Sequence, residues 1–111
     1  MATLFLGCCG PERRHLIPGI GVGFVPAILN RPVLDEVIAV TDERAFECAR
    51  RLAQSEGILA GASSGAALAV ALEIAARPES EGKVIVVLLA DTAERYITTS
   101  LFAKIEGSQC R

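Results

Sequence analysis

The chain has 111 residues, of which 51% are hydrophobic and 22% charged, and its formal net charge is −2. This length is enough for one small domain or for part of a larger one. A nearly balanced charge disfavours a nucleic-acid-binding surface or a polybasic membrane surface. Because aromatic residues are only 5% of the chain, the apolar content is mostly aliphatic, and a small domain of this kind is expected to expose apolar surface that a further part would cover.

Cysteine and histidine usage gives no sign of a metal centre. His15 is the single histidine, and the four cysteines lack CxxC spacing, so we expect reduced thiols in a cytoplasmic protein rather than a zinc site. The opening residues MATLFLGCCG lack the basic and long apolar regions of a signal peptide. No uninterrupted apolar stretch reaches the roughly 18 to 20 residues of a membrane span.

Residues 10–32 are rich in proline and glycine, which predicts a loop. The run GIGVGF within it has GxGxG spacing and no preceding strand, so it does not match a dinucleotide fingerprint. Its glycines indicate instead a backbone that turns tightly or approaches another group closely; they are Gly19, Gly21 and Gly23.

A strand is predicted at Val33–Val40, where short β-branched sequence follows Pro32. A helix is predicted from Thr41, its cap, to Gly57, which suits a left-handed exit. Its apolar residues recur at steps of three and four and form one stripe. These are Ala45, Phe46, Ala49, Leu52 and Ala53.

A second helix is predicted to begin with Ser63 or Ser64 as its N-cap and to end before Arg77 and Pro78. It is apolar on nearly all sides, so we expect neighbours on more than one face. The continuous apolar run Lys83–Ala90 predicts a parallel strand buried on both faces. A turn with Asp91 and Glu94 at capping-box spacing follows. The order strand, helix, helix, strand predicts an α/β layer with parallel strands.

The run GASSGA at Gly61–Ala66 has two interpretations. A helix N-terminus offers free N–H groups and partial positive charge, which suit a polar ligand atom. Alternatively, the serines cap the helix and the glycines allow tight packing at Gly61 and Gly65. Spacing alone leaves both interpretations open.

Three runs together, GIGVGFVP, LDEVIAVTDERAFECARRLAQSEGILAGASSGAALAVALEIA and DTAERYITTSLF, resemble the C-terminal third of cysteine synthase, the O-acetylserine sulfhydrylase family. The resemblance covers residues 10–111 and leaves 1–9 unmatched. It implies a parallel-sheet fragment of the tryptophan synthase β-like fold (fold type II) and pyridoxal 5′-phosphate as cofactor. It also implies an amino-acid substrate and a homo-oligomer or association with an intact family member.

The resemblance assigns one cofactor-binding residue. Ser63 matches the serine that hydrogen-bonds the pyridine nitrogen, and Gly19, Gly21 and Gly23 match a glycine loop beside the active site. A neutral hydroxyl at a positive helix end disfavours a protonated ring, which gives a milder electron sink than a carboxylate would. No catalytic residue and no metal ligand is assigned.

The chain also departs from the family pattern. Pro18 replaces a usual glutamine, Ala90 a usual proline and Ala93 a usual glycine. The Schiff-base lysine, the substrate-binding Asn-Thr-Gly loop and the phosphate cup have no match, and neither Lys83 nor Lys104 lies in a cofactor motif. The chain alone is therefore expected to be a truncated cysteine synthase-like protein without catalytic activity. A partner-binding module and a degenerate gene remnant remain as alternatives.

Overall fold

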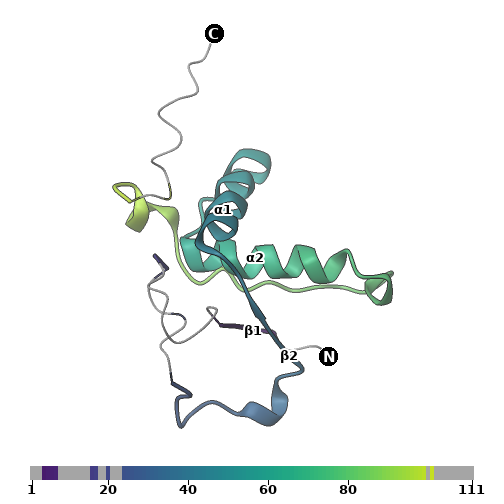
Figure 1. Cartoon of the computed structure of the whole chain (residues 1–111). Helices are drawn as coiled ribbons and strands as arrows, with labels where there is room; N and C mark the ends of the chain where they lie inside the picture. The colour runs from purple at the N-terminus through teal and green to yellow at the C-terminus, as the bar shows by residue number, and fades with distance from the viewer. Residues whose placement is uncertain (1–3, 8–15, 18–19, 21–23, 100, 102–111) are drawn as a thin grey trace.

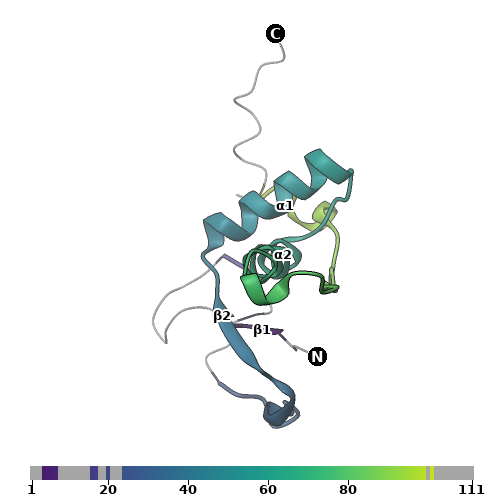
Figure 2. The same ribbon diagram turned by 90° about the vertical axis from the view of Figure 1, so that its right-hand side faces the viewer.

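The structure is a computed structural model that describes residues 4–7, 16–17, 20, 24–99 and 101. Two parallel strands and two helices make up its regular structure there, and α2 lies between α1 and the strands (Figures 1 and 2). The elements are β1 (Leu4–Gly7), β2 (Glu36–Ala39), α1 (Asp42–Glu56) and α2 (Ala62–Ala75), with 3-10 turns η1 (Arg31–Val33), η2 (Pro78–Ser80) and η3 (Ala93–Tyr96).

The predicted α/β class with parallel strands is confirmed, but the observed strand pair differs from the expected one. β1 and β2 pair in parallel, with Leu4 opposite Glu36 and Gly7 opposite Ala39. β2 is shorter than the predicted strand because Pro32 forms part of the 3-10 turn η1 at its start. β1 lies within residues 1–9, and the proposed boundary between residues 9 and 10 stays a prediction.

Helix α1 agrees with its sequence signals. The Thr41 side chain accepts a hydrogen bond from the Arg44 amide at 3.3 Å, as an N-cap does. Gly57 ends the helix with φ of 71°, a left-handed conformation that glycine adopts without steric cost. The buried stripe includes Ala45, Phe46 and Ala49, as predicted.

Helix α2 begins earlier than predicted, with Gly61 rather than a serine as its N-cap, and no side chain caps it. Both serines are therefore helical residues, and the expected N-cap was wrong. The physical reason lies in the backbone, because Gly61 N–H donates to the Asp91 carbonyl and Gly65 N–H donates to the Gly61 carbonyl, which closes the first turn. The predicted end before Arg77 and Pro78 is confirmed.

The two helices cross at Gly65. A methyl group there would overlap the carbonyl oxygen of Ala45 and would lie 2.8 Å from the Ala49 side chain. The packing role predicted for this glycine is therefore confirmed. Around the crossing lies one core of buried side chains, to which a loop residue and a C-terminal residue contribute. Its members are Ile17, Ala45, Phe46, Ala49, Ala62, Ala66 and Leu101.

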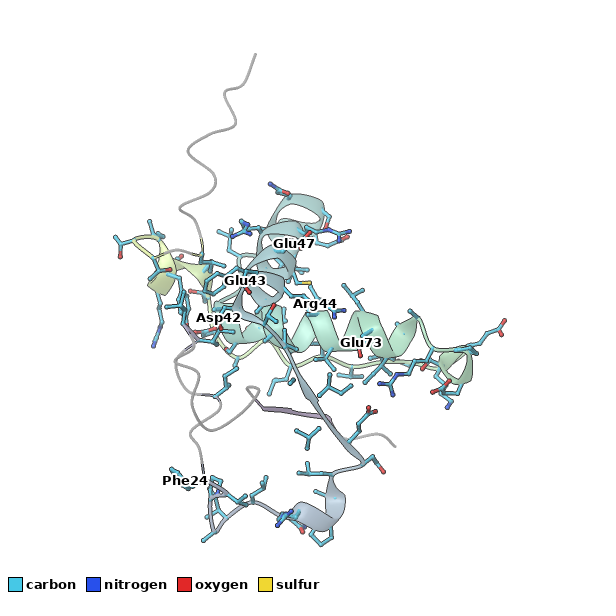
Figure 3. All side chains as sticks on the ribbon, in the orientation of Figure 1. Phe24, Asp42, Glu43, Arg44, Glu47 and Glu73 are labelled. Atoms are coloured by element: carbon cyan, nitrogen blue, oxygen red, sulfur yellow. The ribbon has the colours of Figure 1, made fainter. Side chains whose placement is uncertain are left out.

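Two exposed ion pairs link these elements. Glu73 accepts a hydrogen bond from Arg44 of α1 at 3.1 Å (Figure 3). Arg77 forms two hydrogen bonds with Glu36 of β2, at 2.7 and 3.0 Å. Because both pairs are solvent-accessible, water and salt screen them, and they contribute little to stability.

The predicted buried strand Lys83–Ala90 was wrong. These residues run beside α2 without forming a ladder with any described strand (Figures 1 and 2). Val84, Val86 and Leu88 are 90%, 89% and 83% exposed. An apolar run becomes a strand only where neighbouring strands supply hydrogen-bond partners, and no described segment does so here.

Candidate functional site

The N-terminus of α2 contains the residue that the resemblance assigned to the cofactor. Ser63 is the second residue of the helix and is partly exposed. Among the described residues, no hydrogen bond engages its hydroxyl group. The first N–H groups of a helix have no partner within the helix, so this end combines free donors with partial positive charge. It can therefore bind a neutral or anionic acceptor atom.

The neighbouring Ser64 has a different role. Its side chain is 1% exposed, and its hydroxyl accepts a hydrogen bond from the Ala90 amide at 3.0 Å. This bond holds the end of the extended 83–90 segment against α2. The resemblance implies that proline is usual at position 90, and proline has no N–H to donate. The Ala90 amide thus supplies the donor that engages the Ser64 hydroxyl.

The segment after residue 90 fixes the start of α2. Gly61 N–H donates to the Asp91 carbonyl at 3.1 Å, and Ala93 N–H donates to the Leu59 carbonyl at 3.1 Å. A methyl group at Gly61 would overlap the Asp91 carboxylate and approach the Tyr96 ring. Gly61 is therefore required by the close approach of Asp91, which confirms its predicted packing role.

Asp91 does not form the predicted capping box. The N-cap of η3 is Thr92, and no side chain caps this turn. Asp91 instead accepts a hydrogen bond from the Tyr96 hydroxyl at 2.6 Å through Oδ2, while its buried Oδ1 has no partner among the described residues. The capping-box prediction failed because the chain enters the turn one residue later than the spacing suggested.

The hydrogen bond to Asp91, with smaller effects of burial and of the Asp91 charge, raises the pKa of Tyr96 above its usual value of 10. The pKa of Tyr96 is therefore higher in the folded chain than in the unfolded chain. This interaction contributes its full stabilisation below about pH 10, and the stabilisation is lost as the pH rises through the folded-state pKa.

Tyr96→Phe is therefore expected to lower the free energy of unfolding by about 1 kcal/mol at pH 7. The variant should also lose less stability at alkaline pH than the original chain does. Urea unfolding of both proteins between pH 7 and 11 measures this, and the difference between them should shrink as the pH exceeds 10. A difference that stays constant across this range would contradict the assignment.

The other residues singled out from the sequence divide into two groups. Gly19, Gly21, Gly23, Pro18 and Lys104 lie outside the described residues, so their predicted roles stay predictions. The remaining residues, Lys83, Ala90 and Ala93, are described and lie on the segment between α2 and η3 or within η3.

Lys83 lies at the wrong end of α2 to serve a site at Ser63. Its amide donates to the carbonyl of Ser80, in the turn that follows the helix C-terminus. The 14 residues of α2 span roughly 20 Å, which exceeds the reach of a lysine side chain. Ala93 is buried without a left-handed backbone, since no described non-glycine residue has positive φ, and so glycine is not required there.

Sequence reasoning missed the contact of Asp91 with Gly61 and Tyr96. A glycine that starts a helix is a weak signal of close approach, and nothing in the sequence identifies the approaching residue. Within the described ranges, no three His, Cys, Asp or Glu side chains gather as a metal site would require, and no helix has the length and apolarity to cross a membrane. Cys48 is a free thiol, and burial raises its pKa.

Comparison with known proteins identifies the class of this fold. The family model for pyridoxal-phosphate dependent enzymes matches residues 7–91, and the chain belongs to that family. Within it, the resemblance to cysteine synthase is confirmed. The chain is 50% identical to cysteine synthase A of Escherichia coli over 91 residues, which are 82% of this chain and 28% of that protein.

Other relatives agree. The probable cysteine synthase of Bacillus subtilis is 49% identical over 96 residues, covering 86% of this chain and 30% of the relative. The crystal structure of O-acetyl serine sulfhydrylase isoform 3 from Entamoeba histolytica superposes with a TM-score of 0.89 and 36% identity, over 97% of this chain and 34% of that one. The chain thus spans about 28 to 34% of the length of these relatives, and the tryptophan synthase β-like fold is confirmed for it.

Proposed function

We propose that this chain supplies one end of a cysteine synthase-like active site, where Ser63 binds the pyridine nitrogen of pyridoxal phosphate. The observation that supports the proposal is the contrast between adjacent serines on α2. The Ser64 hydroxyl is buried and bound to the Ala90 amide, whereas the Ser63 hydroxyl has no partner among the described residues. A free hydroxyl at the positive end of a helix suits an acceptor nitrogen in an aromatic ring.

The donor set at this end fits the cofactor ring. When bound, pyridoxal phosphate withdraws electrons from the amino-acid substrate and so permits elimination and replacement at its β-carbon. Ser63 donates a hydrogen bond to the ring nitrogen, and the partial positive charge of α2 disfavours protonation there. Asp91 and Ser64 are positioning residues. The bond of Gly61 to the Asp91 carbonyl and that of the Ala90 amide to Ser64 hold the start of α2 against the following segment.

The overall reaction proposed for the complete protein replaces the acetoxy group of O-acetylserine with sulfide. The given sequence has no residue that matches the Schiff-base lysine, and Lys83 lies beyond the C-terminal end of α2, too far from Ser63 to replace it. The chain is therefore proposed to act only together with a lysine-bearing part, in the cytoplasm and as an oligomer or with an intact family member. The alternatives, a purely partner-binding module or a gene remnant, predict no cofactor contact at Ser63.

The purified 111-residue chain is expected to retain no visible absorbance after incubation with pyridoxal phosphate and dialysis, and to form no cysteine from O-acetylserine and sulfide. The reason is the missing lysine, since a hydrogen bond at the ring nitrogen cannot hold the cofactor covalently. Borohydride reduction followed by mass spectrometry of peptides measures covalent attachment. Stoichiometric labelling of Lys83 or Lys104 would contradict the proposal that neither of them serves as the Schiff-base lysine.

A further inference from the structure

Two side chains from the segment after residue 90 pack against the start of α2. Asp91 is half-buried and lies so close to Gly61 that a methyl group there would overlap its carboxylate. The same methyl group would lie 2.7 Å from Cε2 of the Tyr96 ring, and Tyr96 also packs against the buried core shared by α1 and α2. Asp91 and Tyr96 therefore both lie against the backbone of the N-cap residue of α2, two positions before Ser63.

One hydrogen bond fixes these two side chains relative to each other. The Tyr96 hydroxyl donates to Asp91 Oδ2 at 2.6 Å, whereas the buried Oδ1 of Asp91 has no partner among the described residues. A carboxylate oxygen away from water is unfavourable without hydrogen bonds, so the Tyr96 hydroxyl is needed to keep this carboxylate in place. Without it, the Asp91 side chain is expected to rotate toward water and to leave the Gly61 backbone uncovered.

Asp91 also contacts the helix through its own backbone. Its carbonyl accepts a hydrogen bond from the Gly61 amide at 3.1 Å, so a change in the position of Asp91 acts directly on Gly61. The Gly65 amide donates to the Gly61 carbonyl at 3.0 Å and closes the first helical turn, which contains Ser63. Because the backbone of one turn moves as a unit, a displacement of Gly61 also displaces Ser63.

We infer that Tyr96 is a positioning residue that acts through the Asp91 carboxylate to set the place of the Ser63 hydroxyl. The inference rests on the proposed function, since Ser63 is the residue proposed to bind the cofactor ring. Hydrogen bonds weaken steeply when their geometry is poor, and a misplacement of roughly 1 Å in a catalytic site can cost much of the rate. Tyr96 therefore affects turnover without touching the cofactor.

The first test uses the 111-residue chain without cofactor and compares amide resonances in ¹H–¹⁵N spectra. Tyr96→Phe is expected to shift the resonances of Gly61 and Ser63 and to leave that of Val70, in the interior of α2, in place. Thr99→Val is the matched control, because it removes the other short bond of this turn, from the Thr99 hydroxyl to the Tyr96 carbonyl at 2.6 Å. Unmoved Gly61 and Ser63 resonances in Tyr96→Phe, or equal shifts in Thr99→Val, would overturn the inference.

The second test uses a hybrid in which residues 10–111 replace the matching region of Escherichia coli cysteine synthase A. Tyr96→Phe is expected to lower turnover roughly three- to tenfold, with unchanged cofactor content. A residue that acts through Ser63 loses its effect once the Ser63 hydroxyl is gone, so Tyr96→Phe should cause no further loss in a Ser63→Ala background. Equal losses in both backgrounds would indicate a general structural role and would contradict the inference.

Two changes at Asp91 test the route from Tyr96 to Ser63. Asp91→Ala should lower turnover as much as Tyr96→Phe, because it removes the carboxylate but keeps the backbone carbonyl. Asp91→Asn keeps an acceptor for the Tyr96 hydroxyl and should recover most of that loss. If Ser63→Ala left turnover unchanged, the proposed function would fail and the inference with it. If Ser63→Ala lowered turnover but Tyr96→Phe did not, only the inference would fail.

Discussion

Gly65→Ala is expected to destabilise the chain by about 2 kcal/mol, although alanine favours helix more than glycine by about 1 kcal/mol. The added methyl group would overlap the carbonyl oxygen of Ala45 in α1, and that oxygen is backbone, which cannot rotate away. The helices must separate, and their shared core, which includes Phe46 and Ala66, would loosen. Urea unfolding followed by circular dichroism at 222 nm measures the change.

Gly57→Ala provides the matched control. Nothing lies within 4 Å of an added methyl group there, but φ is 71°, so only backbone strain of about 1 kcal/mol is expected. Gly65 should therefore be the more sensitive site even though its helical backbone suits alanine. If Gly65→Ala instead raised the free energy of unfolding by the helix-propensity difference, the close crossing of α1 and α2 would be wrong.

The sequence predicted the elements whose signals are local. Helix α1 carries its own cap at Thr41, its own stop at Gly57 and an apolar stripe, and all three act as expected. The end of α2 before Arg77 and Pro78 is local in the same sense, because proline restricts the residue before it. Such features can be predicted without knowing which distant residues lie nearby.

Predictions failed where the outcome depends on distant residues. Whether Lys83–Ala90 becomes a strand depends on hydrogen-bond partners elsewhere in the fold. Its apolar sequence suits a buried strand, but no described segment pairs with it here. The start of α2 depends on the Asp91 carbonyl, 30 residues further along the chain, which binds Gly61 and makes a serine cap unnecessary. The capping box at Asp91 failed for a local reason, since the turn begins one residue later, at Thr92, and the Asp91 carboxylate accepts a hydrogen bond from Tyr96 five residues away.

The candidate site also depends on contacts that its local sequence does not reveal. Spacing left both capping and ligand binding open for the run at Gly61–Ala66, and in the structure Gly61 rather than a serine is the N-cap. The structure also gives the two serines different surroundings, since Ser64 is buried and bound to the Ala90 amide whereas Ser63 is partly exposed. This difference depends on residue 90, where alanine donates the N–H that engages Ser64.

Ser63→Ala is expected to reduce turnover roughly ten- to hundredfold in a hybrid in which residues 10–111 replace the matching region of Escherichia coli cysteine synthase A. The reason is the loss of the hydrogen bond proposed between Ser63 and the ring nitrogen, through which the ring withdraws electrons. Cofactor content, measured by visible absorbance, should change little because the hydroxyl does not contact the lysine-bound end. The free energy of unfolding should change by less than about 0.5 kcal/mol, since Ser63 is partly exposed and does not cap α2.

Ser64→Ala in the same hybrid is the internal control and is expected to show the reverse. Loss of the bond to the Ala90 amide should lower the free energy of unfolding by about 1 to 2 kcal/mol, because a part-buried donor loses its acceptor. Turnover should fall by less than about threefold, because the Ser64 hydroxyl is buried and bound to the Ala90 amide and is not proposed to contact the ring. Steady-state rates and urea unfolding of both variants separate the roles. Equal kinetic losses from the two serines, or a change in Ser63→Ala confined to stability, would show that the Ser63 hydroxyl does not bind the cofactor ring.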